Sequence, residues 1–310
     1  MSSDLFQCDA RLRQEILDRA MALGACAAGF AAVEPVDEAH RRLYSQWLGK
    51  SMQGDMAYLE RYCDVRDNPA LLLDGARTIM SIAFCYKTAD TPSHPLFADY
   101  AMGSDYHEVL RRRLEPLCAF MQEIAPGSAT RICIDTAPIR ERYWAAKAGV
   151  GFIGKNNYLI VPGIGSAVFL AEILWTASVE PSPSRLRQTC GGCNRCVRAC
   201  PQGALAYDGT LDCRKCLSYL TIEHRGNLPE DLSLAGKRIY GCDICRHACP
   251  YGEPSPRATV ISELQPRPSI MALDIDAVAA MDQPTFSATF THSAIKRAKL
   301  AGLLRNAKHR

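Results

Sequence analysis

The sequence has no apolar segment long enough to cross a membrane. A transmembrane helix needs roughly 20 consecutive apolar residues, and the best candidate, 166–179, is interrupted by Glu172. The first residues, MSSDLFQCDARLRQ, contain neither an apolar signal region nor a twin-arginine pair. We therefore expect a cytoplasmic protein that does not contact a membrane.

A strong excess of either charge is also missing. The chain has 310 residues, and its 36 Lys and Arg against 33 Asp and Glu leave a net charge of +3. The exception is the segment 295–310, IKRAKLAGLLRNAKHR, which holds six Lys or Arg residues and no acidic residue. A basic segment of this kind favours contact with nucleic acid phosphates, and its common alternative is a solvated chain end.

Cysteine, by contrast, is abundant. An odd total of fifteen in a chain without an export signal favours reduced thiols and metal ligands over disulfides. Nine of the cysteines fall within 190–249. The other six lie mostly in apolar segments, which favours buried structural roles; they are Cys8, Cys26, Cys63, Cys85, Cys118 and Cys133.

Alternating helical and strand-like patterns predict an α/β (α+β) domain over residues 1–180. Apolar residues recur at helical spacing in 12–23 and 110–121, and AAGFAAV, RTIMSIAFCY and RICID read as strands. The Pro- and Ser-rich EPSPSR predicts a linker. It is followed by a cysteine-rich unit, 181–255, and a Pro-rich C-terminal extension with the basic tail, 256–310.

The stretch AGVGFIGKNN, 148–157, comes close to a phosphate-binding loop. It has the glycines and Lys155 of G-x-x-x-x-G-K-[ST], but Asn156 stands where Ser or Thr should be. A phosphate-binding loop follows a strand and opens a helix. Here the helical RERYWAAK precedes the loop and the strand-like YLIV and AVFLAEILW follow it. We therefore predict that the chain does not bind ATP or GTP.

Two cysteine runs predict a pair of 4Fe–4S clusters. CGGCNRCVRACP has the C-x₂-C-x₂-C-x₃-C-P spacing of two-cluster ferredoxins, in which the fourth cysteine ligates the other cluster. CDICRHACP is a second run without its first cysteine, which Cys213 or Cys216 can replace. Zinc is the alternative for C-x₂-C pairs, but it does not explain two C-x₃-C-P endings. Crossed pairing gives one set of Cys190, Cys193, Cys196 and Cys249, and another of Cys200, Cys242, Cys245 and either Cys213 or Cys216.

Over most of its length the sequence resembles the epoxyqueuosine reductases, cobalamin-dependent enzymes of tRNA modification. The blocks that carry the resemblance include GDMAYLERYCDVRDNP, GSDYHEVLRRRL, DTAPIRERYWAAKAGVGFIGKNNYLI, GSAVFLAEI, CLSYLTIEHRG, YGCDICRHACP and LLRNA. The resemblance implies a cobalamin-binding domain followed by a two-cluster ferredoxin-like domain. Some members also carry a C-terminal helical-repeat domain, which we do not expect here.

The resemblance further implies site residues and partners. Gly154, Leu159 and Leu170 would lie next to the corrin ring, with the glycines of GVGFIG letting backbone approach the macrocycle. Arg66 and Ser218 would lie at the cofactor periphery, and the CLSYL block selects Cys216 as the missing ligand. The partners would be a tRNA carrying epoxyqueuosine and an external electron donor of the flavodoxin or ferredoxin type. We expect the protein itself to be a monomer.

Asp135 is the predicted catalytic residue. From the sequence alone it is a cap or turn residue after a strand, but the family's proton donor matches this position in DTAP. Reduction of the epoxide needs two electrons and two protons. Cob(I)alamin would attack an epoxide carbon, and the clusters would supply the electrons. The acid would protonate the leaving oxygen. Burial beside the macrocycle is expected to raise the pKa of Asp135. His107 is the rival acid.

Two other functions fit part of the pattern. Reductive dehalogenases share cobalamin and two 4Fe–4S clusters, but resemble exported proteins with twin-arginine leaders, which this sequence does not have. A cluster-stabilised RNA-binding module would explain the tail and the cysteines, but it leaves the large α/β domain and Asp135 without a role.

Overall fold

The computed structural model describes residues 7–230, 232, 234, 238–252 and 261–309. Its centre is a four-stranded antiparallel sheet in the order β2-β3-β7-β4. The strands of this sheet are β2 (Ala27–Ala32), β3 (Thr78–Cys85), β4 (Thr130–Cys133) and β7 (Val168–Trp175). Short pairs lie beside it, formed by β1 (Gln7–Cys8) with β8 (Ser178–Val179) and by β5 (Phe152–Ile153) with β6 (Leu159–Ile160).

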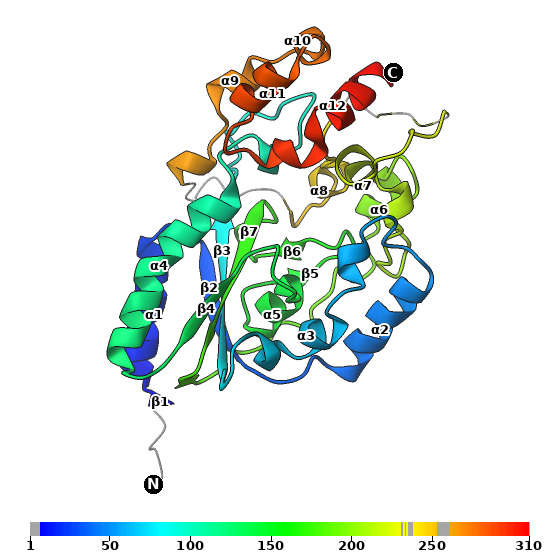
Figure 1. Ribbon diagram of the computed structural model, residues 1–310. Coiled ribbons are helices and arrows are strands. Elements are labelled where there is room, and N and C mark those ends of the chain that lie inside the picture. The colour runs from blue at the N-terminus through cyan, green and yellow to red at the C-terminus, as the bar shows by residue number, and fades with distance from the viewer. Residues whose placement is uncertain (1–6, 231, 233, 235–237, 253–260, 310) are drawn as a thin grey trace.

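Helices cover both faces of the central sheet (Figure 1). On one face α1 (Ala10–Ala22) and α4 (Tyr106–Ile124) pack against alternate residues of β3, such as Met80 and Ile82. On the other face α5 (Glu141–Lys147) packs against Ile79 and Ala83. Because side chains alternate across a strand, β3 has apolar neighbours on both sides and is buried throughout. The sequence patterns predicted these strands and helices correctly.

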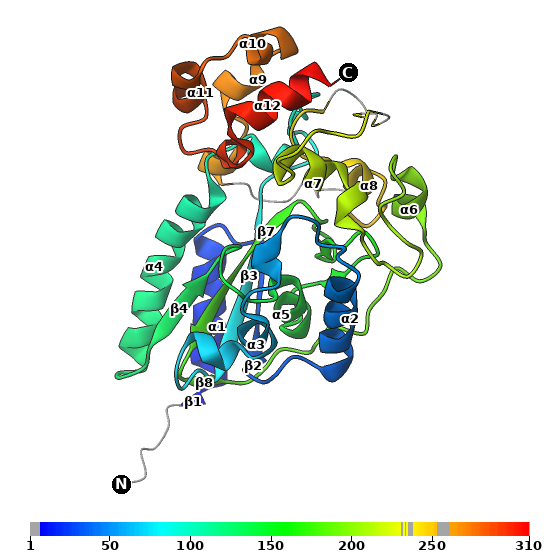
Figure 2. The ribbon, with the colours of Figure 1, turned by 45° about the vertical axis from the view of Figure 1, so that its right-hand side comes forward.

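The remaining helices lie beside the second face or beyond one end of the sheet (Figures 1 and 2). On the second face, together with α5, lie α2 (Glu38–Gly49) and α3 (Cys63–Asp67). The cysteine-rich unit contains α6 (Arg195–Ala199), α7 (Leu217–Ile222) and α8 (Ile244–His247). The C-terminal segment forms α9 (Pro268–Met271), α10 (Ile275–Ala279), α11 (Gln283–Thr289) and α12 (Lys299–Lys308). Among the helices in the described ranges, none has the length and apolar character of a membrane span.

The basic tail is part of this packing, so it is not a solvated chain end, whereas its contact with nucleic acid phosphates stays a prediction. Ile295 and Leu303 are fully buried in a core shared with Phe97 and Phe290. Arg305 donates hydrogen bonds to three backbone carbonyls, those of Leu220, His224 and Gly226. The apolar residues that lie between the basic residues of α12 hold this helix against α7.

Candidate active site and cluster-binding unit

A cavity of about 440 Å³ lies between the sheet and the cysteine-rich unit. Its walls combine three kinds of side chain. The apolar residues include Leu159, Val168, Phe169, Leu170 and Leu217. The polar and ionisable residues include Tyr106, Asp135, Glu141, Arg142 and Ser218. The thiols are Cys200, Cys216, Cys242 and Cys245. A partly apolar cavity with a few converging polar groups is the usual form of a cofactor site.

Asp135 lies just beyond the end of β4 in an unusual backbone conformation. Its φ is +48°, the left-handed region that non-glycine residues rarely adopt. Its backbone N–H donates to Glu141 Oε1 at 2.5 Å, which fixes the turn from the start of α5. The side chain is 56 % exposed and borders the cavity. Strain held at a cavity wall by a specific hydrogen bond is typical of a functional residue.

His107 holds the Asp135 carboxylate from the opposite side. Its Nε2 lies 3.1 Å from Asp135 Oδ2, and its Nδ1 lies 2.7 Å from Asp105 Oδ1. A neutral imidazole has one N–H, whereas the imidazolium has two and can donate to both carboxylates. Burial alone would lower the pKa of His107, but hydrogen bonds to Asp105 and Asp135 raise it to about 9. The ring is therefore charged at neutral pH.

The pKa of Asp135 is lowered, contrary to the expectation from sequence. The protein around the partly exposed side chain removes water from it, which acts in the expected direction and raises the pKa. Hydrogen bonds from His107 and Tyr106 and the charge of His107 together outweigh this effect. The proton of this pair therefore rests on His107. The sequence did not indicate this pairing, because the two residues lie 28 positions apart.

Glu141 and Glu172 are two further carboxyls that the sequence analysis did not single out. Burial and the charge of Asp135 raise the pKa of Glu141, which borders the cavity. Glu172 lies in β7, fully buried, and burial and Glu141 raise its pKa far above the ordinary value. One oxygen of Glu172 has no hydrogen-bond partner among the described residues. A neutral, protonated Glu172 fits its burial, because an ionised carboxylate buried without a cation is very costly.

The cysteines of the two runs form two separate groups of neighbours. The electrostatic neighbours of Cys245 are Cys200, Cys216 and Cys242. Those of Cys249 are Cys190 and Cys196, and Cys196 also interacts with Cys193. This division matches the crossed pairing expected from the spacing. Cys213 is buried in a core against which Cys216 and Cys242 also pack, but it donates its backbone N–H to Met52 O and is not among the lining residues of the cavity.

The segment Lys155–Asn157, which looked like a phosphate-binding loop, instead holds the cysteine-rich unit. Lys155 Nζ donates to Gly191 O at 3.0 Å, Cys193 O at 3.1 Å and Asn194 Oδ1 at 2.8 Å. Asn156 Nδ2 donates to Cys245 O at 3.3 Å, and Asn157 Nδ2 donates to Gly209 O at 2.8 Å. All three ammonium donors thus have acceptors in the protein, so Lys155 is occupied by the loop that carries the first cysteines.

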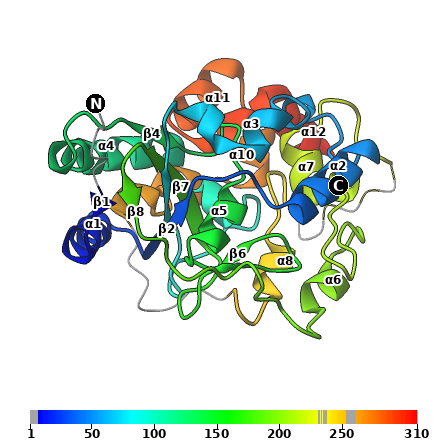
Figure 3. The ribbon, with the colours of Figure 1, turned by 90° about the horizontal axis from the view of Figure 1, so that it is seen from below.

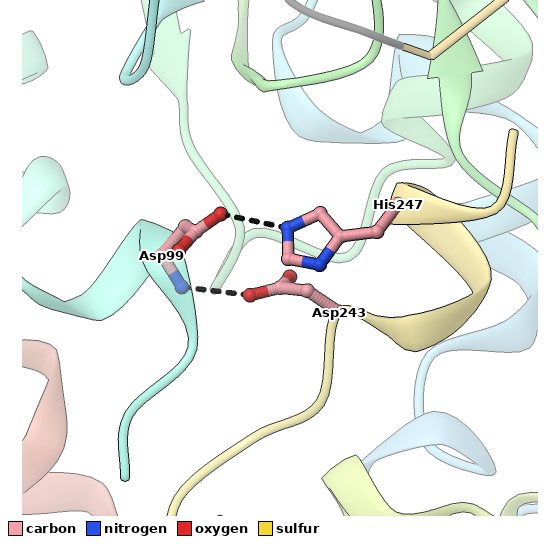
Figure 4. Close-up of side chains that lie close together, drawn as sticks. All are labelled: Asp99, Asp243 and His247. Atoms are coloured by element: carbon pink, nitrogen blue, oxygen red, sulfur yellow. Dashed lines mark hydrogen bonds and ion pairs between the residues drawn. The ribbon is translucent and has the colours of Figure 1, made fainter. Parts of the chain in front are cut away.

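A buried ion-pair network anchors α8, the helix between Cys242 and Cys249. Asp99, Asp243 and His247 lie close enough to hold a cation (Figure 4). However, Lys87 Nζ lies 2.9 Å from Asp99 Oδ2 and Arg246 also pairs with this oxygen. Burial raises the pKa of Asp99, but His247, Lys87 and Arg246 together lower it well below its ordinary range. The cationic side chains already compensate the carboxylates, so the group is an internal tie between the sheet domain and the cysteine-rich unit.

The structure brings some of the expected cofactor neighbours together and separates others. Leu159, Leu170 and Ser218 border the cavity with Asp135. Gly154 and Arg66 are not among its lining residues. A Cβ on Gly154 would lie 2.7 Å from Asn156 Oδ1 and 2.8 Å from Ile160 Cδ1. The close contacts that require this glycine are therefore within the chain, and its place beside a corrin ring stays a prediction.

Comparisons with known proteins agree with this site. A family model described as "Epoxyqueuosine reductase QueG, DUF1730" matches residues 66–136, and one described as "4Fe-4S double cluster binding domain" matches residues 189–252. An epoxyqueuosine reductase of Gloeobacter violaceus is 36% identical over 308 residues, covering 95% of this chain and 94% of the relative. One from Synechococcus sp. (strain RCC307) is 35% identical, covering 93% and 89%. The chain belongs to the epoxyqueuosine reductase family.

Solved structures of the family share the whole fold. An epoxyqueuosine reductase bound to an epoxyqueuosine-modified tRNA-Tyr stem loop matches with a TM-score of 0.82 and 29% identity, covering 96% of this chain and 80% of that chain. A Bacillus subtilis member, whose catalytic aspartate loop is swung out of the active site, matches with a TM-score of 0.80 and 28% identity over the same shares. Reductive dehalogenase structures match at 14% to 15% identity with TM-scores below 0.5.

Proposed function

We propose that this chain reduces epoxyqueuosine at the wobble position of tRNA to queuosine, the last step of queuosine biosynthesis. The observation that carries the proposal is the cavity itself, which has a proton-donating pair on one wall and four thiols on another. In this proposal residues 1–180 form the cobalamin-binding catalytic domain. Residues 181–255 form the ferredoxin-like domain with two 4Fe–4S clusters, and 256–310 are a C-terminal extension.

The residues around the cavity fit a large cofactor with a flat apolar face. Leu159 and Leu170 would lie against the ring, and Ser218 would bond at its edge. Arg66 Nη2 donates to Tyr58 O at 3.4 Å, and its buried Nε has no partner within the described part of the chain. A buried guanidinium N–H without an acceptor supports a role at the cofactor periphery, because leaving it unpaired costs about 1–3 kcal/mol. Gly154 stays a predicted neighbour of the ring.

The two cysteine groups would hold the clusters. One cluster would be bound by Cys190, Cys193, Cys196 and Cys249, and the other by Cys200, Cys216, Cys242 and Cys245. The second group shares the cavity with the proposed cofactor. When bound, cobalamin supplies the reduced centre that opens the epoxide, and the clusters supply it with electrons.

The side chains of this chain supply the proton. The leaving oxygen of the epoxide develops negative charge and needs an acid within hydrogen-bond reach. Asp135 borders the cavity, and its Oδ2 receives a proton from His107 Nε2 at 3.1 Å, so that Asp135 is the group that delivers it. Asp105 Oδ1, 2.7 Å from His107 Nδ1, stabilises the charged ring and holds its orientation. The second proton that forms water can be drawn from the protonated carboxyl of Glu141 on the same wall.

The substrate partner is a tRNA carrying epoxyqueuosine in its anticodon, as in the complex of the related enzyme. Electrons would come from an external donor of the flavodoxin or ferredoxin type. A monomeric state and a cytoplasmic location stay predictions from the sequence.

The proposal is tested by anaerobic reconstitution with iron, sulfide and cobalamin, followed by incubation of the reduced protein with epoxyqueuosine-containing tRNA. Nucleosides from the digested tRNA are identified by mass spectrometry. We expect conversion to queuosine, with the loss of one oxygen atom, only when cobalamin is present. Conversion without cobalamin, or no conversion by protein that holds all its cofactors, would reject the proposal.

A further inference from the structure

The two cysteine groups differ in their position relative to the cavity. All four cysteines of one group line it, namely Cys200, Cys216, Cys242 and Cys245. The cysteines of the other group are not among its lining residues, and two of these, Cys190 and Cys193, are only partly buried in an exposed loop. Electrons from an external donor therefore first reach the group that does not line the cavity. We call this the outer group; it includes Cys190 and Cys193.

The chain around this outer group carries charge of one sign. Residues 181–207 contain four arginines and neither Asp nor Glu. Arg185 is engaged, because its Nε donates to Gly149 O at 2.9 Å. The side chains of the other three are exposed and have no ion pair or hydrogen bond within the described ranges. We call these three residues, Arg187, Arg195 and Arg198, the basic rim.

The basic rim contributes no ion pair or hydrogen bond to the described part of the fold. Arg195 lies between Cys193 and Cys196 in the sequence, and Arg198 lies on α6 just before Cys200. Three exposed, unpaired guanidinium groups beside a redox site would attract an acidic partner over about 8 Å at physiological ionic strength. Charges of this kind mainly raise the rate of association and make it dependent on salt.

A tRNA is also acidic, but the substrate must reach a different part of the molecule. The chemical end of the cavity is at Asp135, whose charged neighbours include Arg297 from the C-terminal segment. Arg297 packs over Tyr58 at 5.7 Å and pairs with Glu223. In Figure 3, α6 lies apart from α4, α11 and α12. The charge that acts on Asp135 from the C-terminal segment is therefore that of Arg297, which does not belong to the basic rim.

We propose that the basic rim is the docking surface for an acidic one-electron carrier protein, a reduced flavin or iron–sulfur protein. Each encounter oxidises the carrier by one electron and reduces the outer cluster by one electron. Two encounters supply the two electrons that the epoxide consumes, and the two protons come from the cavity side chains. The inference rests on the proposed function only in requiring that the clusters be reduced, so cluster reduction can be measured without tRNA.

The experiment compares the reconstituted holoenzyme with the triple variant Arg187→Gln/Arg195→Gln/Arg198→Gln. Cluster bleaching is followed by stopped flow with two reductants, a flavodoxin hydroquinone and the methyl viologen radical cation. A matched control, Arg11→Gln/Arg77→Gln/Arg111→Gln, removes three exposed arginines, one from α1, one directly before β3 and one from α4. In Figure 1, α1 and α4 lie on the side of the sheet away from α6. Iron content and tRNA affinity are measured for all three proteins. The single variant Arg187→Gln, outside the cysteine runs, serves if the triple variant does not retain its clusters.

We expect reduction by flavodoxin to slow by about tenfold or more at low salt in the rim variant, with a flatter salt dependence. Reduction by viologen, tRNA affinity and the control variant should stay within about twofold of wild type. An equal loss with viologen would overturn the proposal, because the arginines would then act on the cluster itself. Weakened tRNA binding with unchanged flavodoxin kinetics would also overturn it and assign the rim to RNA. Failure of epoxyqueuosine reduction with normal cluster kinetics would contradict the proposed function and leave this inference standing.

Discussion

Replacement of His107 by Gln separates the source of the catalytic proton from its delivery. Gln keeps an N–H group that can donate to Asp135 Oδ2, but it cannot carry an exchangeable acidic proton. In the wild type the pKa of His107 rises from the ordinary 6.5 to about 9, which corresponds to roughly 3 kcal/mol in favour of the charged ring. The wild type therefore holds its proton throughout the neutral range. The stability that this charge gives is fully present below pH 6.5 and is lost as pH rises through 9.

Without His107, Asp135 must take its proton directly from solvent. A carboxyl with an ordinary pKa is protonated in a fraction on the order of 10⁻³ of molecules at pH 7. We therefore expect the single-turnover rate of His107→Gln at pH 7 to fall by about 10² to 10³, within the usual range for an acid catalyst. The pH profile should change as well. The wild-type rate should decline only above about pH 9, whereas the variant should decline throughout the neutral range.

The assay is a rapid-quench measurement of queuosine formation by pre-reduced enzyme from pH 5.5 to about 9.5, where the wild-type decline sets in. His292→Gln is the matched control, since His292 also lies against a carboxylate, Glu108 Oε2 at 2.8 Å, on the same helix but is not among the lining residues of the cavity. Its profile should match that of wild type. If His107→Gln kept the wild-type rate and a decline near pH 9, the proton would not come from His107.

Four further predictions concern the clusters, Lys155 and the tail. After anaerobic reconstitution we expect about eight iron atoms per chain, with Cys216→Ala losing half of them and Cys213→Ala none; iron analysis showing the reverse would exchange the two residues. Lys155→Met should lower the thermal stability of the holoenzyme and its iron content without changing ATP binding, which should be undetectable by calorimetry in both proteins; saturable ATP binding lost in the variant would restore a phosphate site. Truncation after Thr291 should abolish folding as judged by circular dichroism, because it removes buried side chains. The tail's role in RNA binding is instead tested by Gln substitutions of its exposed lysines, which should reduce the salt dependence of tRNA affinity if they contact phosphates; an unchanged slope would make them solvated surface. These lysines are Lys296, Lys299 and Lys308.

Local patterns in the sequence predicted most of the fold. The helix of 110–121 and the strand of 77–86 lie within α4 and around β3, since each pattern reflects one element packing against the sheet. The division of the cysteines followed from spacing, because a cluster constrains neighbouring thiols within a short run. The tail was misread because its basic residues were counted without regard to the apolar residues between them, such as Ile295 and Leu303.

Contacts between distant segments could not be predicted in this way. The Lys155 ammonium is bonded by a loop more than 30 residues away, and only the folded chain shows that its donors are used. The pKa of Asp135 depends on His107, which comes from another element, so burial alone gave the wrong direction. In the sequence Glu172 only interrupts an apolar strand. In the structure it is a buried carboxyl whose pKa is raised by burial and by Glu141, and the strand pattern could not show this.

The central claim is that the protein reduces the epoxide in this cavity and that Asp135 delivers the proton to the leaving oxygen. The most direct test is a single turnover of epoxyqueuosine-containing tRNA by pre-reduced wild-type enzyme and by Asp135→Asn, each with full iron and cobalamin content. The amide preserves the size of the side chain but cannot deliver a proton. We predict that the wild type forms queuosine and that the variant is slower by at least about 10², or roughly 2.7 kcal/mol of transition-state stabilisation. A variant with full cofactors and a near wild-type rate would contradict the claim.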